Sequence, residues 1–365
     1  MSPRARWGLD RSNVNFELAL GLRHTALVDS TWQYIRLLRA HRPPLVGDDR
    51  ADVFSSALEQ SEQLMRAAEA VGPAARPLPL FYSLSQAGRA IAAARLPDDQ
   101  WRLSGHGVSV RSLPGQADLL RRTVVPDRLG KKAIEDGRRS SFAGVAEAVV
   151  SGQLTGPVEL GAVWCALPDL IPPITPQMPA LDPGWRRPLV VFDFYWDHGE
   201  QALSGMFGTE LIVCGLTPGA TAQQLQEELS HYPAAAGALV RTNAHLGPVG
   251  TASAVIMATT PEGRDCPRIT WPEPRELHPR LDDIAPFNHR VGARMLLPSL
   301  ADRDAPSALM LWWILLLGLS SIARYDPELW VAALDLNRPT AVPIEVALDR
   351  AIAAVPSLVL EALAP

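Results

Sequence analysis

The stretch from residue 80 to residue 107 places polar side chains inside a segment that otherwise has the pattern of an apolar helix. At 100° per residue, Tyr82, Ser85 and Arg89 fall on one stripe, at positions i, i+3 and i+7. Alanines surround this stripe, so we expect the Arg89 guanidinium to be buried and hydrogen-bonded. A buried guanidinium needs an anion. That anion is either a protein carboxylate, which we prefer, or the phosphate of a substrate.

His106 stands between two glycines in the triplet Gly105-His106-Gly107, which follows this helix after a short loop. Flanking glycines let the backbone approach another element closely and orient the ring. An imidazole titrates near neutral pH and can move protons. His106 and Arg89 are therefore our candidate catalytic residues, and Tyr82 and Ser85 are candidate binding residues. For each residue taken alone we prefer the structural interpretation, in which His106 closes a loop against the core and Arg89 holds a loop in place.

Arg324 follows a long apolar run and is a third candidate for binding. It lies at the expected C-terminal end of a helix, where the helix dipole favours a cation. Asp326 and Glu328 are near enough in sequence to pair with it, so we prefer the interpretation of a structural helix-end motif to that of a binding residue. Convergence of Arg89, His106 and Arg324 on one cleft would favour a functional site, whereas their dispersal would favour a scaffold protein.

Metal and cofactor motifs are weak in this chain. In VVFDFYWDHGE, Asp193 and Asp197 share a strand face but lie about 13 Å apart, too far to share one metal ion. His198 or Glu200 could join Asp197, but no spaced set of ligands supports such a site. The phosphate-loop, dinucleotide, GxSxG and HExxH motifs are incomplete or missing. We therefore expect no metal and no cofactor.

The composition is that of an ordinary globular chain. The 365 residues are 47% hydrophobic and carry a net charge of −5. An acidic balance gives no general attraction to nucleic acid, so RNA binding would need a local basic patch. Cys165, Cys214 and Cys266 are far apart, and their odd number argues against a disulfide framework. Because the N-terminal residues also lack an apolar signal region, we expect a cytoplasmic protein.

Helical periodicity dominates the first part of the chain, which we assign to residues 1–171. The segment 108–140 is basic and is predicted to be a loop. A linker at 172–186 follows, in which residues 172–184 contain five prolines. Proline and glycine pairs mark the predicted helix ends. The predicted helices are 14–41, 52–71, 78–95, 141–150 and 158–167.

The pattern changes at residue 187, where an α+β segment begins that we extend to residue 274. Its strands are rich in β-branched and aromatic residues and are bounded by glycine and proline. A C-terminal helical part follows at 275–365. We predict strands at 187–197, 209–216, 253–260 and 268–273, and a helix at 221–232 with Thr221 as its N-cap.

The run ALMLWWILLLGLSSIA (308–323) has sixteen residues without a charge. A membrane-spanning helix needs about 20 residues. We therefore predict a buried core helix and no membrane association. The resulting fold class is mixed α and α+β, with predominantly helical N- and C-terminal parts packed together and a small α+β segment between them.

Three stretches, in this order and spacing, resemble the YaaC-like family of bacterial proteins. They are FYSLSQAGRAI followed by GHG, ELGAVWCALPDL (159–170) and WWILLLGLSSIARYDPELW (312–330). The similarity covers roughly residues 50–363, and the region 187–273 matches least well. The family has no well-defined activity, so the resemblance implies a bacterial protein and little about its chemistry.

The first of these stretches is also similar, more distantly, to the helical domains of the HEPN superfamily, which include bacterial RNases and toxins of defence systems. Those RNases carry an arginine and a histidine separated by four to six residues. Arg36 and His41 are the one match here, and chance matches are expected in a chain so rich in arginine. Leu37 replaces the usual polar residue after the arginine, so this pair is a weak alternative catalytic site.

Our leading functional hypothesis is a HEPN-related RNase, or a nucleic-acid-binding relative of one, in bacterial stress or defence. The second hypothesis is a non-catalytic scaffold or partner subunit, in which the apolar C-terminal helix and the ten tryptophans serve packing and oligomerisation. A metal-dependent hydrolase is a third. The first hypothesis implies RNA as a partner, and the second implies a protein partner or a second copy of the chain.

Overall fold

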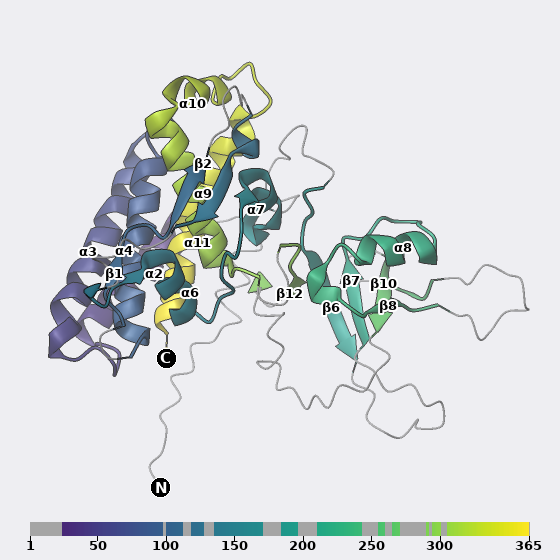
Figure 1. The fold of residues 1–365 in the computed structure, drawn as a ribbon, viewed down its shortest axis with the longest axis horizontal. Helices are drawn as coiled ribbons and strands as arrows, with labels where there is room; N and C mark the ends of the chain where they lie inside the picture. The colour runs from purple at the N-terminus through teal and green to yellow at the C-terminus, as the bar shows by residue number, and fades with distance from the viewer. Residues whose placement is uncertain are drawn as a thin grey trace, which may run out of the picture.

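The structure, a computed structural model, describes most of the chain. A helical body and a smaller body built on a β-sheet stand side by side (Figure 1). This arrangement confirms the predicted mixed α and α+β fold class. The described residues are 24–97, 100–111, 118–127, 135–170, 184–195, 210–242, 255–259, 265–270, 290–291, 294–300 and 305–364.

The first half of the helical body comes from the N-terminal part of the chain. The long helices end where predicted, at the proline and glycine pairs, and α4 begins with a proline at its first turn, where no amide hydrogen is needed. Residues 14–23, predicted to begin the first helix, lie outside the described residues. The N-terminal helices are α2 (His24–Ala40), α3 (Asp48–Ala70), α4 (Pro77–Arg95), α6 (Ser141–Ala148) and α7 (Leu160–Ala166).

Two small sheets join these helices, and the prediction of a loop over 108–140 was wrong. Strands β2 and β3 pair antiparallel, and Val108 on β2 and the consecutive Val124 and Val125 on β3 are buried. The strands are too short, and too interrupted by arginine, to show in a windowed pattern. One sheet pairs β1 (Leu103–Ser104) with β4 (Arg139–Ser140), and the other has the order β2 (Val108–Arg111), β3 (Thr123–Pro126), β5 (Val158–Glu159).

The second half of the helical body comes from the C-terminal end of the chain. These helices are α9 (Ala308–Tyr325), α10 (Pro327–Ala333) and α11 (Ala341–Leu363). Helix α4 contacts both α9 and α11, so helices from opposite ends of the chain lie side by side (Figure 1). A single hydrophobic core runs through both halves.

Helix α9 is the core helix that the apolar run predicted. Among the described residues it is the one helix long and apolar enough to cross a membrane, and 78% of it is buried inside the protein. Trp312 and Trp313 are fully buried within it, and the Trp312 indole donates a hydrogen bond of 2.8 Å to Asp169. Burial in the protein accounts for the missing charges.

The smaller body is an antiparallel sheet with its own hydrophobic core. Its order is β11 (Arg290–Val291), β12 (Arg294–Leu297), β6 (Leu189–Tyr195), β7 (Glu210–Cys214), β10 (Asp265–Thr270), β8 (Leu239–Val240), with β9 (Met257–Thr259) also on β10. Thr221 caps α8 (Ala222–Leu229) through a capping box with Gln224, as predicted. Strands β11 and β12 lie beyond the predicted end of the α+β segment at 274.

The sheet is inserted between the two halves of the helical body. The chain enters it after Trp185, whose indole donates a hydrogen bond of 2.9 Å to Glu159. It returns beside its point of entry, because the Ser299 hydroxyl donates to the Arg186 carbonyl at 2.6 Å. The insertion therefore leaves the helical core continuous.

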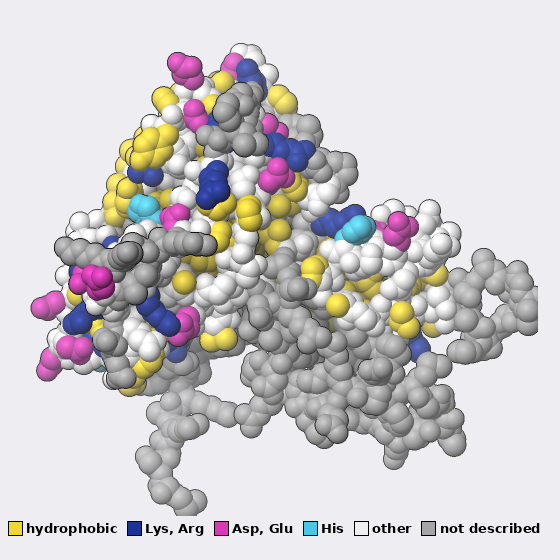
Figure 2. All heavy atoms as spheres, in the orientation of Figure 1, with side chains coloured by type: hydrophobic (Ala, Val, Ile, Leu, Met, Phe, Trp, Pro, Cys, Tyr) yellow, Lys and Arg dark blue, Asp and Glu magenta, His cyan; other side chains and the backbone are white. Residues whose placement is uncertain are grey.

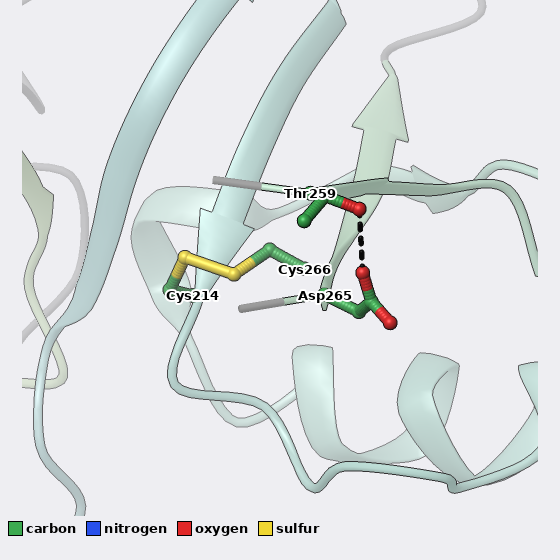
Figure 3. Close-up of a disulfide and its surroundings, with 4 residues drawn as sticks. All are labelled: Cys214, Thr259, Asp265 and Cys266. Carbon is green, nitrogen blue, oxygen red and sulfur yellow. Dashed lines mark hydrogen bonds between the residues drawn. A yellow bond between two sulfur atoms is a disulfide. The ribbon is translucent and has the colours of Figure 1, made fainter. Parts of the chain in front are cut away.

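The expectation that the cysteines form no disulfide was wrong. Cys214 on β7 and Cys266 on β10 are joined across neighbouring strands, with their Cα atoms 5.1 Å apart (Figure 3). Thr259 donates a hydrogen bond of 2.7 Å to Asp265 beside them. The pairing register places the two cysteines opposite each other, which their separation of 52 residues could not reveal.

Candidate anion-binding site

The polar stripe of α4 forms the floor of the candidate site. Nearly every other side of this helix is buried, and alanines allow α3 and α9 to pack closely against it. Ser85 is buried, while Tyr82 and Arg89 are half-buried. The helix therefore places Tyr82 and Arg89 two turns apart at the edge of the core, where one end of each side chain can meet solvent.

The Gly105-His106-Gly107 loop is held by three successive carbonyl groups. The Ser141 hydroxyl donates to the Gly105 carbonyl at 2.6 Å, and the Trp313 indole donates to the His106 carbonyl at 3.3 Å. The Asp127 amide donates to the Gly107 carbonyl at 2.9 Å. Helices α6 and α9 and the end of β3 thus fix the loop, and with it the position of the His106 ring.

Both glycines are required by the backbone of this loop, as the sequence suggested. Gly105 and Gly107 have φ angles of +65° and +84°, a region that favours glycine. A Cβ atom on Gly107 would also lie 2.5 Å from the Phe142 amide nitrogen, whereas one on Gly105 would meet open space. Gly107 therefore permits both the turn and the close approach to α6.

Aromatic rings surround the His106 imidazole. Phe81 lies edge-on to it, with ring centroids 5.1 Å apart, and the Tyr82 ring lies 6.2 Å away. Phe81 also packs edge-on against Trp313. Trp313 approaches α4 closely because Gly88 leaves room: a Cβ there would lie 2.7 Å from the indole. The imidazole is thus half-buried in an apolar wall on a fixed backbone.

Arg324 reaches this site from the C-terminal end of α9. Its Nη1 atom donates to the Tyr82 hydroxyl at 3.4 Å, and its Nε atom donates to the Ser320 carbonyl at 3.3 Å. The guanidinium also lies over the ring of Tyr325, with its carbon 4.9 Å from the ring centroid. Arg324, Tyr82 and His106 therefore converge from α9, α4 and the loop before β2.

The expectation that Asp326 or Glu328 pairs with Arg324 was wrong. Asp326 instead forms an ion pair with Arg122, with 3.0 Å between the nitrogen and the oxygen. Arg122 is buried and directly follows the short 3₁₀-helix η1 (Leu119–Arg121). In the described ranges, Arg324 bonds neutral oxygens and no carboxylate. Its positive charge is therefore not cancelled by the acidic residues that follow it in sequence.

The expected carboxylate partner of Arg89 is also not found. Among the residues that the structure describes, Arg89 makes no side-chain hydrogen bond and no ion pair, and it is half-buried, not fully enclosed. The prediction of a buried, hydrogen-bonded guanidinium was therefore wrong. Arg50 is instead a buried structural arginine on α3: it is 6% exposed and donates to the Leu96 carbonyl at 2.6 Å at the end of α4.

The environment of His106 favours its neutral form. Burial lowers the pKa of the imidazole below its usual value, and the charges of Arg324 and Arg89 lower it further, while Asp127 raises it. The ring atom Nδ1 is buried and makes no hydrogen bond. A buried polar atom without a partner is costly and calls for an explanation, of which a catalytic role is one.

The arrangement can hold an anion beside a neutral base. Arg324 contacts the Tyr82 hydroxyl beside the imidazole, and the charges of Arg324 and Arg89, neither bonded to a carboxylate in the described residues, both favour the neutral form of that imidazole. Phosphate oxygens match guanidinium donors in charge and geometry. The sequence indicated Tyr82, Ser85, Arg89, His106 and Arg324 as candidates. It gave no sign of Trp313, Phe81, Arg122 or Asp127, since their roles depend on tertiary contacts.

The weak alternative pair Arg36 and His41 lies elsewhere, at the end of α2. Arg36 forms an ion pair with Glu62 on α3, in which Nε donates to Oε2 at 2.9 Å. His41 is exposed, and its Nδ1 atom contacts the Leu37 carbonyl at 3.3 Å. A guanidinium already bound to a carboxylate has little capacity for a second anion, so these contacts do not favour this pair.

The comparisons with known proteins place the chain in a family. The family model described as "YaaC-like Protein" matches residues 26–175 and 223–363. The chain belongs to the YaaC-like family. Searches of curated proteins and of solved structures found no match.

The two blocks of the YaaC-like match contain all the candidate site residues. Tyr82, Arg89 and His106 lie in the first block, and Arg324 lies in the second. Strands β6 and β7 fall between the blocks, in the part of the sheet that the family model does not match. The family pattern therefore covers the helical body, where the candidate site lies.

An open hollow of about 600 Å³ occurs in the smaller body, beside α8. It is lined by Arg186, residues 217–220, Gln224, Glu227, Glu228 and His231. Its charges are mixed, and Glu228 already accepts a hydrogen bond of 3.0 Å from the Thr217 amide. The hollow includes none of the predicted site residues, so we place the candidate site at His106 on the basis of its chemistry.

The metal position considered and not favoured in the sequence analysis is not tested by the structure. Asp197, His198 and Glu200 lie outside the described residues. Among the residues that are described, no group of three or more histidine, cysteine, aspartate or glutamate side chains is arranged to hold a metal ion.

Proposed function

We propose that this YaaC-like protein binds a phosphodiester at the His106 site and cleaves it, with RNA as the substrate. The observation that carries the proposal is that Arg324 contacts Tyr82 beside the His106 ring, and that Arg324 and Arg89, neither bonded to a carboxylate in the described residues, both lower the pKa of that imidazole. Cations hold the phosphate, and a neutral imidazole accepts a proton.

In the proposed reaction the 2′-oxygen of the RNA attacks the adjacent phosphorus. The proton of the 2′-hydroxyl passes to the neutral imidazole of His106 as the bond between the 2′-oxygen and phosphorus forms. The bond between phosphorus and the 5′-oxygen breaks, and that oxygen takes a proton from water. Arg89 and Arg324 stabilise the negative charge that develops on the phosphoryl oxygens. The products are a 2′,3′-cyclic phosphate and a 5′-hydroxyl.

The proposal is consistent with the more distant similarity to HEPN-type RNases, but it places the chemistry at His106 and not at the Arg36 and His41 pair.

Figure 2 shows that, on the face it presents, Lys and Arg side chains of the helical body are interspersed with Asp and Glu side chains. Binding would therefore depend on a few local contacts. For two phosphate contacts to single-stranded RNA we expect a slope of log K against log[salt] of about −1.4.

The decisive experiment incubates the purified protein with a labelled RNA oligomer at low salt and follows cleavage products. We expect His106→Ala to slow cleavage by about 100- to 10,000-fold. Arg89→Ala and Arg324→Ala should each slow it by about 100- to 1,000-fold, as loss of one charge-stabilising donor does. A 2′-deoxy oligomer should not be cleaved, because it lacks the attacking hydroxyl.

Two histidine variants serve as controls. His231→Ala removes an exposed histidine of the smaller body and should leave cleavage unchanged. His41→Ala tests the alternative site directly, because the Arg36 and His41 pair requires it. Cleavage lost in His41→Ala but kept in His106→Ala would move the chemistry to that pair, and an inert wild-type protein would remove the enzymatic proposal.

A second candidate function, a partner subunit or scaffold, is favoured by one surface feature. Val331, Leu336 and Val342 are 60%, 82% and 53% exposed. They lie on α10, on the loop after it and on the first turn of α11, at one extremity of the helical body (Figure 1). Exposed apolar side chains close together in sequence are a feature of interaction surfaces.

The scaffold candidate predicts association that depends on these residues. Analytical ultracentrifugation of the wild-type chain should then show a concentration-dependent oligomer, and Val331→Asp with Leu336→Asp should abolish it. A monomer at all concentrations would contradict self-association.

We propose a cytoplasmic, non-membrane location for either function, which fractionation of the untagged protein would test.

A further inference from the structure

The residue after Arg324 has an exposed aromatic ring. Tyr325 is the last residue of α9, and its side chain is 73% exposed, although the helix before it is buried. Its ring contacts the Arg324 guanidinium, 4.9 Å from carbon to centroid. Within the described part of the chain, Tyr325 makes no side-chain hydrogen bond. Its aromatic surface is therefore left largely to solvent.

The position of this ring relates it to the anion-binding site. Arg324 contacts Tyr82 with one nitrogen and lies over Tyr325 with its planar face. A guanidinium can bond a phosphate with its edge while an aromatic ring packs on its face. In a nucleotide, the base is joined to its phosphate through one sugar. A phosphate held by Arg324 therefore brings a base into the neighbourhood of the Tyr325 ring.

We propose that Tyr325 is a stacking platform for a nucleobase, and that the site consequently takes single-stranded nucleic acid. This inference rests on the proposed function and adds the class of substrate to it. Aromatic rings bind unpaired bases by stacking, with little dependence on sequence. The bases of a duplex are stacked on one another, so a duplex cannot offer a free base face to the ring.

The test compares binding of three probes by fluorescence anisotropy at low salt. The probes are a single-stranded, 2′-O-methylated RNA oligomer, which cannot be cleaved by 2′-hydroxyl attack, the same oligomer with abasic sugars, and a duplex of the first. We expect the wild-type protein to bind the single strand most tightly. Tyr325→Ala should weaken binding of the single strand roughly 5- to 150-fold, the range for loss of one base stack.

The pattern across probes and variants separates stacking from charge. Tyr325→Ala should leave binding of the abasic oligomer unchanged, and Tyr325→Trp should retain binding of the single strand. Arg324→Ala should weaken binding of both. Tyr34→Ala removes another exposed tyrosine, on α2, and is the matched control that should bind as the wild type does.

Two outcomes distinguish failure of this inference from failure of the proposed function. If Arg89→Ala and Arg324→Ala weaken binding but Tyr325→Ala does not, the anion site stands and the stacking role is overturned. If the wild-type protein binds none of the probes, both are overturned. Equal loss of abasic and base-containing oligomers in Tyr325→Ala would also contradict stacking, since only one of them has bases.

Discussion

Three charged residues act on His106 from different elements, and their balance determines its charge. Arg324 and Arg89 lower the pKa of the imidazole from α9 and α4, after burial, which is the largest cause. Asp127, at the end of β3, raises that pKa, but it also accepts a hydrogen bond of 2.5 Å from Ser109. At neutral pH the imidazole is therefore neutral and able to accept a proton.

Removal of the Arg324 charge should raise the pKa of His106. The measurement is a titration of the His106 ring by NMR in the wild type and in Arg324→Gln. Arg76→Gln is the matched control, because Arg76 pairs with Asp349 and does not contribute to the lowered pKa. An unchanged titration in Arg324→Gln would contradict the proximity on which the site is built.

The lowered pKa of His106 also determines how cleavage and folding stability should depend on pH. A base works when deprotonated, so the acidic limb of the rate profile should lie below the usual histidine range and move to higher pH in Arg324→Gln. A pKa lowered by folding means that the unfolded chain binds the proton more tightly. His106 therefore contributes stability above its unfolded pKa of about 6.5, and this contribution is lost as the pH falls through the folded pKa.

The two glycines beside His106 should differ in their sensitivity to substitution. Gly105→Ala introduces only a left-handed alanine, at a cost of about 1–2 kcal/mol. Gly107→Ala adds a close contact with α6, so we expect a loss of about 2–5 kcal/mol in the free energy of unfolding. Urea denaturation of the two variants measures the difference. Equal losses would contradict the role of Gly107 in close packing.

At the scale of the elements, α4 is the helix on which the site depends. Its sequence predicted its bounds within one residue, 78–95 against Pro77–Arg95, because proline and glycine punctuation is a local property. The partner of its arginine could not be predicted in the same way. Which carboxylates approach Arg89 or Arg324 depends on how α9 and η1 pack, and Asp326 turns to Arg122 although it is two residues from Arg324.

The C-terminal end of α4 is stabilised by Arg50, whose loss should destabilise the helical body. Arg50 donates to the carbonyls of Ala93 and Leu96 from a buried position. Arg50→Met leaves those helix-end carbonyls without a donor, so we expect a loss of about 2–4 kcal/mol. Arg66→Met, which removes a partly exposed partner of Glu62, should cost about 1 kcal/mol or less. Thermal unfolding of both variants checks the order.

At the scale of the whole molecule, the helical body has one hydrophobic core and the inserted sheet has a second. The sequence predicted the strands of 187–197, 209–216 and 268–273, because they are β-branched runs bounded by glycine and proline. It could not predict that β11 and β12 join the same sheet, because their short segments gain their conformation from pairing with β6. The pairing of β7 with β10 also brings together Cys214 and Cys266, which form the disulfide.

Reduction of the disulfide should weaken the smaller body and leave the helical body intact. Closing a loop of 52 residues stabilises by up to about 4 kcal/mol in the chain-entropy estimate. Hydrogen exchange with and without reductant should therefore show faster exchange in β6, β7 and β10, with α4 and α9 unchanged. The Cys214→Ser and Cys266→Ser double variant should behave like the reduced protein.

Cys165 provides an internal check on this experiment. It is buried in α7, and burial raises the pKa of its thiol to about 11, so little thiolate forms at neutral pH. Thiol labelling of the native protein should therefore be slow, and reduction should add reactivity at Cys214 and Cys266 alone. Rapid labelling of Cys165, or uniform loss of protection across both bodies, would contradict the division into two cores.

The pairing of α4 with α9 also has a consequence for biosynthesis. A ribosome adds about 5–20 residues per second, so α9 is completed on the order of ten seconds or more after α4. During that interval the surface of α4 that α9 covers in the finished fold has no native cover, while the sheet between them is being made. The nascent chain is therefore most prone to aggregate in the interval between the synthesis of α4 and that of α9, whatever the free energy of unfolding of the finished protein.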